Sequence, residues 1–439
     1  MQIKEYLDEF CKVNCDCGKV HASSVKEIIV KSGAINELPR LINNFNAKKP
    51  FILADVNTNL VAGKSVLEIL DREEINYSTF IFEESALKPD DKAIEKARGN
   101  FDKACDLVIA VGSGVINDLG KIVANEFNLP YFIVGTAPSM DGYASSTSSM
   151  EIDGLKVSLN SKCADVIIGD VDILKNAPEK MLISGLGDML AKYISLAEWK
   201  IASEIVGEYY CERVANLVRV ALRTCVDNAG GLLKREETAV KAVFEGLVIG
   251  GVAMAYAGMS RPASGVEHYF SHILDMRALK FNTKSDLHGI QCAVATLLSA
   301  KLYEKALRLT PDKEKALASV KAFDYQKYKR QLKAFLGKSA IAMIELEKTE
   351  KKYCKRRHKK RLDIILAKWE KIKEIIEYEI PKPNELEKIF DLLGVPKTFA
   401  ELGVDADLYS AFLATKDIRD KYVLSRLLWD LGETEIFYD

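Results

Sequence analysis

The first third of the chain alternates short apolar runs with amphipathic stretches, and this alternation constrains the fold more than any other feature. Helical patterns lie between the apolar runs, over 63–73, 91–100 and 118–127. Strands that alternate with helices at this spacing build βαβ units, so we predict an α/β domain with a parallel, doubly wound sheet. The runs with the length and residue types of buried strands are 51–55, 77–82, 107–111, 131–134 and 166–170.

The pattern changes after Pro178, where long helical periodicities replace the short strands. We therefore predict two domains, an α/β domain over 1–176 and an all-α domain over 177–439. Before that boundary, the polar segment 145–159 surrounds Asp153-Gly154, a signal for a hairpin turn. The expected long helices of the second domain are 179–199, 203–225, 236–259 and 287–309.

Composition and charge exclude several classes of protein. Apolar residues make up 48% and charged residues 28%, which suits buried cores and excludes disordered or collagen-like chains. The net charge of −1 provides no overall positive field for nucleic acid. No uninterrupted apolar run reaches the roughly 18 residues of a membrane span, and residues 1–10 have no apolar core of a secretory signal. Nine cysteines do not suggest a disulfide scaffold, so we expect a cytoplasmic protein.

One tract stands apart from the rest of the second domain. Residues 312–381 contain long stretches without Pro or Gly, and they include the basic run 351–361. Such a tract is typical of a solvated pair of surface helices. The alternative is a local patch that binds anions or nucleic acid.

The transition from 107–111 into Gly112-Ser-Gly114 and then into a helix is a candidate phosphate-binding turn. Small residues there let backbone N–H groups approach a phosphate, and the helix dipole favours its charge. A plain tight turn is the alternative, since Asn117 stands where a GxGxxG motif needs its third glycine. A second small-residue turn, 135–139, supports a nucleotide-binding cleft. Asp55 ends an earlier strand, where it could accept ribose hydroxyls or simply cap a turn.

The second half carries a candidate metal site. Three of the five histidines cluster, with His268 and His272 one helical turn apart and His288 at the start of another helix. Asp188 lies in a mainly apolar helix, where a buried carboxylate needs a partner such as a cation. Two imidazoles and one carboxylate leave open coordination positions, as a catalytic metal requires. Each histidine could instead be an ordinary core or surface side chain.

Other chemical motifs are weak or missing. A zincin protease needs Glu after the first histidine of HxxxH, and Tyr269 stands there. The sequence contains no GxSxG, no P-loop and no CxxC. Neither a hydrolase with a nucleophile elbow nor a kinase with a Walker motif is therefore supported. Cys15, Cys17 and His21 resemble half of a metal site, but no second half follows.

Together these motifs resemble the iron-containing alcohol dehydrogenase and glycerol dehydrogenase superfamily, and most of all its sn-glycerol-1-phosphate dehydrogenase branch. The resemblance implies a Rossmann-like first domain, a helical second domain and an active site in the cleft between them. It covers most of the chain except 312–381. It is carried by residues 112–118, 136–145, 185–188, 260–272 and 288–289, with 15–21 and 418–422 near the two ends.

The resemblance assigns roles to particular residues. The first domain is expected to bind NAD(H) or NADP(H) and the second a divalent metal, held by Asp188, His268 and His288. His272 falls where the family contacts substrate and is a candidate proton relay, while Asp141 and Asp188 are further candidates to bind substrate. The cofactor positions are Gly112, Gly114, Val115, Ile116, Asn117, Asp118, Thr136, Ala137, Pro138, Ser139 and Ser145, with Asp55 added from the strand-end argument.

Two basic residues could hold a substrate phosphate, Arg261 and Lys192, although either could be an ordinary ion-pair residue. Lys192 also stands where some iron-type relatives place a ligand histidine. Its presence excludes a fourth imidazole and favours zinc, with nickel or iron as alternatives.

The expected reaction is reduction of dihydroxyacetone phosphate to sn-glycerol 1-phosphate, in phospholipid biosynthesis, by a cytoplasmic homodimer. The alternatives are a dehydrogenase of glycerol or another polyol or sugar phosphate, or a metal lyase of the 3-dehydroquinate synthase type. A nucleic-acid-binding protein that uses 351–361 is less favoured, and we expect neither membrane nor nucleic acid as a partner.

Overall fold

The computed structural model describes residues 3–153 and 155–438, which form two compact units. Unit 1 comprises the chain up to Met189 together with Asn216–Met259, and unit 2 comprises Leu190–Ala215 and the chain from Ser260 onward. This division differs from the one expected at 176, because a helical segment beyond that point packs on the sheet and returns to unit 1.

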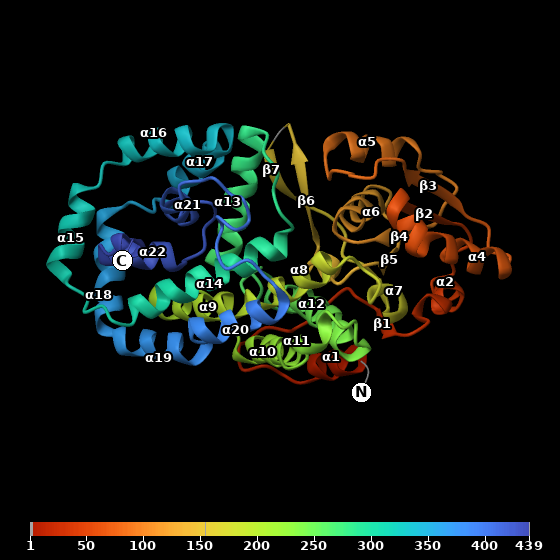
Figure 1. The fold of residues 1–439 in the computed structure, drawn as a ribbon, viewed down its shortest axis with the longest axis horizontal. Coiled ribbons are helices and arrows are strands. Elements are labelled where there is room, and N and C mark those ends of the chain that lie inside the picture. The colour runs from red at the N-terminus through yellow and green to blue at the C-terminus, as the bar shows by residue number, and fades with distance from the viewer. Residues whose placement is uncertain (1–2, 154, 439) are drawn as a thin grey trace. The chain divides into compact units, whose positions relative to one another are not determined.

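Unit 1 is built on a parallel sheet of six strands in the order β1-β8-β5-β4-β2-β3, counted over the described residues (Figure 1). The α/β fold with a parallel sheet is therefore confirmed. The sequence analysis missed only β1, a short strand flanked by charged residues at one edge of the sheet. The strands are β1 (Glu27–Lys31), β2 (Pro50–Asp55), β3 (Ser78–Phe82), β4 (Leu107–Gly112), β5 (Tyr131–Gly135) and β8 (Val166–Asp170).

Helices cover both faces of this sheet, as a doubly wound fold requires. On one face, α2 (Leu38–Asn44) and α4 (Lys64–Arg72) pack against Ile109 and Phe132 and their neighbours. On the other, Gly120 of α6 (Gly114–Glu126) lies against Ala110. The remaining helices of this part of the chain are α1 (Ile3–Lys12), α3 (Val56–Thr58), α5 (Asp91–Gly99), α7 (Val171–Leu174), α8 (Glu179–Leu190), α10 (Glu212–Asp227), α11 (Ala229–Leu232) and α12 (Glu237–Ala257).

The predicted hairpin forms between β6 (Thr147–Ile152) and β7 (Leu155–Asn160), which pair antiparallel with Met150 opposite Val157. Asp153 adopts a positive φ of 52°, as a tight turn requires. The second turn residue, Gly154, lies outside the described residues, as do Met1 and Gln2 of the expected non-secretory start.

Unit 2 is helical in its described part, as expected for the second half. The predicted helix 179–199 is in fact two helices that meet at Ala191, and Gly207, with a positive φ of 69°, ends the second of them. The helices are α9 (Lys192–Val206), α13 (Val266–Phe281), α14 (His288–Ala306), α15 (Lys313–Ala322), α16 (Tyr325–Leu336), α17 (Ala340–Glu350), α18 (Lys355–Ala367), α19 (Trp369–Glu379), α20 (Pro383–Leu393), α21 (Leu408–Thr415) and α22 (Leu424–Leu431).

The tract 312–381 corrects the expectation of a solvated helix pair. It forms five α-helices, α15 to α19, and the short 3-10 helix Gly337–Ser339, within a stretch that the structure describes without gaps. Leu362, Ile365 and Ile372 are fully buried in it, and His358 of the basic run donates from Nε2 to the carbonyl of Asp430 at 2.8 Å. The tract is therefore part of the core of unit 2.

One described helix, α12, is long and apolar enough to cross a membrane by length and composition. The sequence analysis expected no uninterrupted apolar run of this length. Lys241 and Glu245 interrupt the apolar residues of α12, so the helix does not contain such a run. In the structure 67% of its most apolar window is buried. Its Phe244 packs where a Cβ on Gly169 of the central sheet would lie, which explains its apolar sequence as core packing.

Candidate active site

The glycine turn lies where β4 meets α6. Gly112 is tightly enclosed, since a Cβ there would lie 2.5 Å from the Cβ of Ile116. Gly114 faces more open space, with Met140 3.7 Å away as the nearest side chain. The first helical hydrogen bond runs from Asn117 N to Ser113 O, so the N–H groups of residues 114–116 precede it. These are the donors that a phosphate could meet.

Asn117 does not present its side chain to a cofactor. The amide is fully buried, its Nδ2 donates to the carbonyl of Gly142 at 3.0 Å, and its Oδ1 accepts from the Tyr131 hydroxyl at 3.0 Å. This corrects the expected cofactor role for its side chain and explains why glycine is not needed there. Asn117 instead fixes the loop that carries Asp141.

Lys121, which the sequence analysis did not identify, supports the same loop. Its ammonium group is fully buried and donates to the carbonyls of Gly142 at 2.6 Å and Thr147 at 3.1 Å. It also pairs with Asp118 at 3.3 Å. The available signal was a lysine among the mostly apolar buried residues of α6.

Asp118 and Ser145 connect α6 to the hairpin. Burial raises the pKa of Asp118 despite the nearby Lys121, and one carboxylate oxygen accepts from Ser149 N at 3.0 Å. The Ser145 hydroxyl lies 3.0 Å from that of Thr147. Both residues have structural partners here, and a cofactor contact for either is a prediction from the resemblance.

Helix α8 presses against the loop 136–139. The Ser184 hydroxyl donates to the carbonyl of Ser139 at 2.9 Å, and Thr136 N donates to Gly112 O at 3.0 Å. A Cβ on Gly185 would lie only 1.8 Å from the carbonyl oxygen of Pro138. Glycine at 185 is therefore required for this approach, which the sequence alone did not reveal.

Asp188 and Asp141 lie together within unit 1. Asp188 is fully buried, and its Oδ2 accepts from the backbone N–H of Asp141 at 2.9 Å. Helix α8 thus brings the expected ligand Asp188 beside the loop that bears the expected substrate residue Asp141.

Asp55 adopts the capping alternative. Its Oδ1 accepts from Asn57 N and Thr58 N at 2.8 Å each, and the backbone N–H of Asp55 donates to the Thr58 hydroxyl at 3.0 Å. The result is a capping box at the start of α3.

Within unit 2, α13 and α14 bring the three histidines together. The ring centroids of His268 and His288 are 5.0 Å apart, and those of His272 and His288 are 5.7 Å apart. Cys292, one turn along α14, joins them: ligand atoms of His268, His288 and Cys292 all lie within 4.8 Å of one another. Burial would raise the pKa of Cys292, but the two imidazoles outweigh it and the pKa is lowered. Its i,i+4 spacing from His288 was the signal that could have found it.

Two neighbours fix the orientation of these imidazoles. The Nδ1 of His268 lies 2.8 Å from Glu267 Oε1, and the Nδ1 of His288 lies 2.9 Å from the Ser271 hydroxyl. With each Nδ1 engaged, Nε2 is the nitrogen suited to ligate a metal, an arrangement typical of histidine ligands. The Nε2 atoms of His268 and His288 are therefore suited to ligate a divalent ion.

Glu267 is itself part of a buried carboxylate pair with Glu198. Both Oε2 atoms lie within 2.7 Å of the position that a Cβ on Gly265 would take. Glu198 accepts from Val266 N at 2.9 Å and Leu424 N at 2.7 Å. Burial and the charge of Glu267 raise the pKa of Glu198 to about 8.

Arg261 takes the ion-pair alternative. It is fully buried, forms a bidentate pair with Glu208 at 2.7 and 2.5 Å, and donates to the carbonyl of Tyr422 at 2.9 Å. Its guanidinium therefore bonds to groups of the protein itself, which argues against the expected contact with a substrate phosphate. Lys192 is fully buried at the start of α9.

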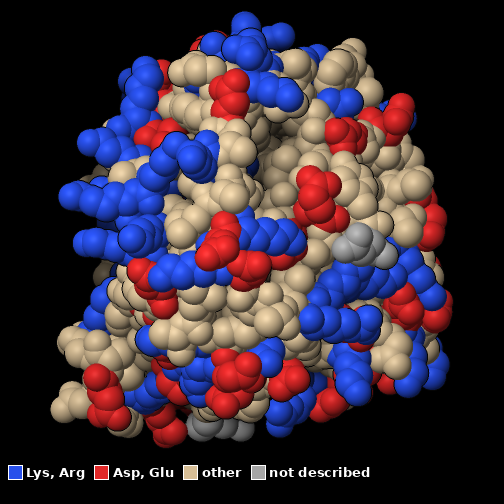
Figure 2. Space-filling model, turned by 90° about the vertical axis from the view of Figure 1, so that its left-hand side faces the viewer, with Lys and Arg blue, Asp and Glu red and all other residues tan. Residues whose placement is uncertain are grey.

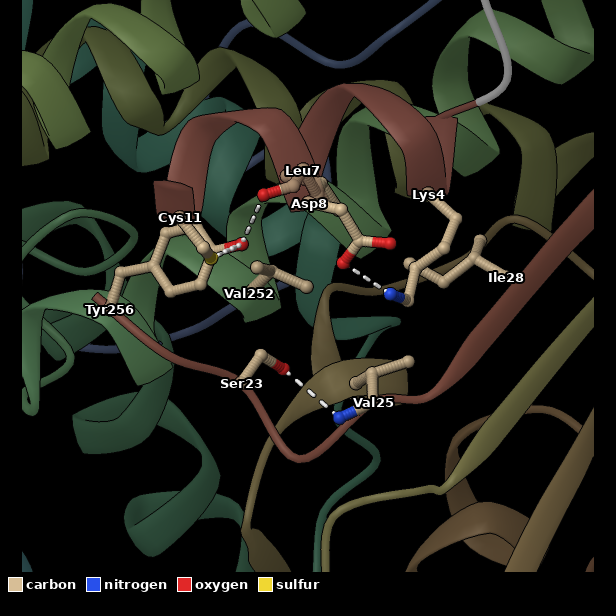
Figure 3. Close-up of a pocket in the computed structure, with 9 residues that line it drawn as sticks. All are labelled: Lys4, Leu7, Asp8, Cys11, Ser23, Val25, Ile28, Val252 and Tyr256. Carbon is tan, nitrogen blue, oxygen red and sulfur yellow. Dashed lines mark hydrogen bonds and ion pairs between the residues drawn. The ribbon is translucent and has the colours of Figure 1, made fainter. Parts of the chain in front are cut away.

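The segment 15–21 packs against α12. His21 Nδ1 lies 3.0 Å from the carbonyl of Tyr256, and Cys17 Sγ lies 3.4 Å from His21 Nε2. Figure 3 shows the adjacent cavity, where the Cys11 thiol donates to the Tyr256 hydroxyl at 3.1 Å. Its volume of about 30 Å³ has room for about one water molecule, so it is too small for a substrate.

Comparison with known proteins decides the family. The iron-containing alcohol dehydrogenase family matches residues 29–178. Glycerol-1-phosphate dehydrogenase (NAD(P)+) of Halalkalibacterium halodurans is 32% identical over 298 residues, which cover 67% of this chain and 75% of that protein. The enzyme of the same name from Methanosarcina mazei is 34% identical over 279 residues, covering 63% and 76%.

The chain belongs to the glycerol-1-phosphate dehydrogenase family. This family consists of NAD(P)-dependent oxidoreductases, as the names of its members state. The fold agrees: the crystal structure of glycerol dehydrogenase from Schizosaccharomyces pombe has a TM-score of 0.58 and 17% identity, and the match covers 94% of this chain and 90% of that one.

Proposed function

We propose that the protein interconverts dihydroxyacetone phosphate and sn-glycerol 1-phosphate with NAD(P)(H), acting mainly as a reductase. The observation that carries this proposal is the 32% identity to a glycerol-1-phosphate dehydrogenase over 75% of that enzyme. The glycine turn and the histidine cluster, each intact in its own unit, support it.

The cofactor is proposed to bind at the carboxyl edge of the sheet. The N–H groups of residues 114–116 at the start of α6 would receive the pyrophosphate, and the loop 136–139 would flank it. Asn117 and Lys121 hold the neighbouring loop by donating hydrogen bonds to the carbonyl of Gly142. Asp55 uses one carboxylate oxygen as a cap, which leaves its other oxygen for a ribose hydroxyl.

A divalent metal, zinc in preference to nickel or iron, is proposed to be held by Asp188, His268 and His288. The donor set fits, because hydrogen bonds at Nδ1 direct Nε2 of both imidazoles toward ligation. When bound, such an ion polarises the substrate carbonyl and stabilises the alkoxide that hydride transfer produces. Cys292 lies close enough to both imidazoles to perturb the site.

The remaining residues are proposed to position substrate and move a proton. His272, which is half-buried beside His288, would supply the proton for the product hydroxyl. Asp141 would accept a substrate hydroxyl bond, with its backbone held by Asp188. Since Arg261 is paired with Glu208, Lys192 is the remaining sequence candidate for the phosphate.

Purified protein incubated with NADH or NADPH and dihydroxyacetone phosphate tests the proposal. Oxidation of the reduced cofactor, lost on chelation and restored by Zn²⁺, supports it. A folded, metal-loaded sample that oxidises neither cofactor with this substrate would contradict it. Glycerol and other triose phosphates in the same assay separate the neighbouring activities, and elemental analysis identifies the metal.

A cytoplasmic homodimer completes the proposal. Light scattering on the eluted protein measures its mass against the 48.9 kDa of one chain, and a monomer would contradict a dimer.

A further inference from the structure

Unit 2 contains a cavity of about 420 Å³ that no residue of the proposed active site lines. It is formed by the ends of α9 and α17, by α18, and by the segment from 416 to 426. Figure 2 views the end of the molecule that carries α15 to α18 and shows Lys and Arg side chains gathered along one side of it. The lining residues are Ile205, Val206, Glu350, Lys351, Lys352, Arg357, Lys360, Arg361, Ile364, Lys416, Asp420, Lys421, Tyr422 and Arg426.

The charges around this basic pocket do not balance. Eight of the lining residues are Lys or Arg, and only Glu350 and Asp420 are acidic. Buried acids outside the lining neutralise part of this charge: Asp417 pairs with Lys416 and Arg426, and Asp430 holds Arg361 in a bidentate pair. The whole chain has a net charge of −1, so the pocket is a local concentration of positive charge.

The guanidinium of Arg426 is almost wholly enclosed beside this pocket. The side chain is 4% exposed, its Nη2 donates to Asp417 at 3.0 Å, and its Nη1 is buried without a hydrogen-bond partner among the described residues. A buried guanidinium N–H that makes no bond is costly. The guanidinium carbon lies 4.9 Å from the ring centroids of Tyr353 and of Trp429, so Arg426 adds positive charge to the pocket wall without presenting an open donor to a ligand.

Three lysines at the pocket lie in surroundings that disfavour their charged form. Burial, aided by Arg426, lowers the pKa of Lys352 and of Lys416 to about 8 each. Burial, aided by Arg261 and Arg419, lowers the pKa of Lys421 to about 7. Burial away from water is the main cause, and an anion bound nearby would favour the protonated form of these amines again.

One side of the pocket is apolar. Ile205 is buried at the end of α9, and Val206 and Ile364 remain 46% and 36% exposed. A volume of about 420 Å³ exceeds the space that inorganic phosphate needs and falls within the range of organic ligand sites. The pocket thus combines a cationic floor with an apolar wall.

We propose that this basic pocket binds an organic polyphosphate of nucleotide size, with its phosphates on the cationic floor and its less polar part against Ile205, Val206 and Ile364. Guanidinium and ammonium groups are the donors that recognise phosphate. Since the lining belongs wholly to unit 2 and includes no residue proposed for catalysis, the ligand would be distinct from the substrate and from the cofactor.

Calorimetric titration of the full-length protein with ADP tests this proposal. NADH is left out because it carries the same diphosphate, and charge reversal in the pocket separates this site from the cofactor site. Lys360→Glu reverses an exposed charge that lines the pocket. Lys359→Glu is the matched control, because Lys359 is exposed on the same helix but lies beside Asp363 and outside the pocket. We expect Lys360→Glu to weaken ADP binding about tenfold, and Lys359→Glu to change it less than about twofold.

Pyrophosphate and a single-stranded oligonucleotide are the other arms of the experiment. Weaker binding of pyrophosphate than of ADP, with the same sensitivity to Lys360→Glu, supports an organic ligand. Tighter binding of the oligonucleotide with that sensitivity overturns the small-ligand proposal in favour of nucleic acid. No ADP binding by the native protein, or equal effects of the two variants, also overturns it. Neither result bears on dehydrogenase activity, which the reductase assay measures separately.

Discussion

Gly185 offers the sharpest test of how the active-site loop is positioned. Replacing a helical glycine by alanine ordinarily stabilises a helix by about 1 kcal/mol. Here the new Cβ would lie 1.8 Å from the carbonyl oxygen of Pro138, whereas real Cβ atoms essentially never come within 3.0 Å of such an atom. The loop or α8 must therefore move by at least about 1.2 Å, the difference between these distances.

The loop cannot move so far without losing bonds. Thr136 N–Gly112 O and Ser184 Oγ–Ser139 O, at 3.0 and 2.9 Å, hold it on either side of Pro138. Overpacking costs about 1–3 kcal/mol and one lost hydrogen bond about 1 kcal/mol. These costs exceed the gain in propensity, so we expect Gly185→Ala to lower the free energy of unfolding by about 1–3 kcal/mol.

The loop is also proposed to flank the cofactor, so a displacement near 1 Å should reduce kcat/KM for NAD(P)H by about 10²-fold. Urea unfolding and steady-state kinetics measure the two effects. Gly230→Ala is the control, because a Cβ at this helical glycine meets nothing within 4 Å. A Gly185→Ala variant as stable and active as Gly230→Ala would refute the reasoning.

Three further predictions follow from the site. Burial and Glu267 raise the pKa of Glu198 to about 8, whereas its pKa in the unfolded chain is the usual 4.5, so between these pH values only the folded state keeps the proton. The free energy of unfolding should therefore fall as pH rises from about 5 to about 8. Glu198→Gln should flatten this pH dependence in urea titrations. Arg261→Ala leaves Glu208 without its bidentate partner, so it should lower the thermal midpoint of unfolding with little change in KM for dihydroxyacetone phosphate. Lys192→Ala should instead raise that KM. If Arg261→Ala raises KM and Lys192→Ala does not, Arg261 is the phosphate contact. Chelation should abolish cofactor oxidation, and retained activity in a sample shown by elemental analysis to be metal-free would exclude the proposed metal.

The sequence determined the fold because the relevant signals are local. Strand β4 is apolar at each position, as a strand covered on both faces must be, and the glycine turn follows it directly. The i,i+4 spacing of His268 and His272 likewise indicates one helical face. Strand β1 escaped detection because only two of its five residues are buried and charges flank it at the edge of the sheet.

Tertiary structure decided the partners of the polar side chains. Asn117 bonds to Gly142, and Arg261 bonds to residues 53 and 161 positions away, so no local pattern could distinguish these roles from contacts with a ligand. The same holds for Gly185, whose need for glycine comes from a distant carbonyl. Periodicity records which face of an element is buried. Which polar groups meet inside the protein depends on how the elements pack, because each buried donor must find an acceptor wherever the folded chain places one.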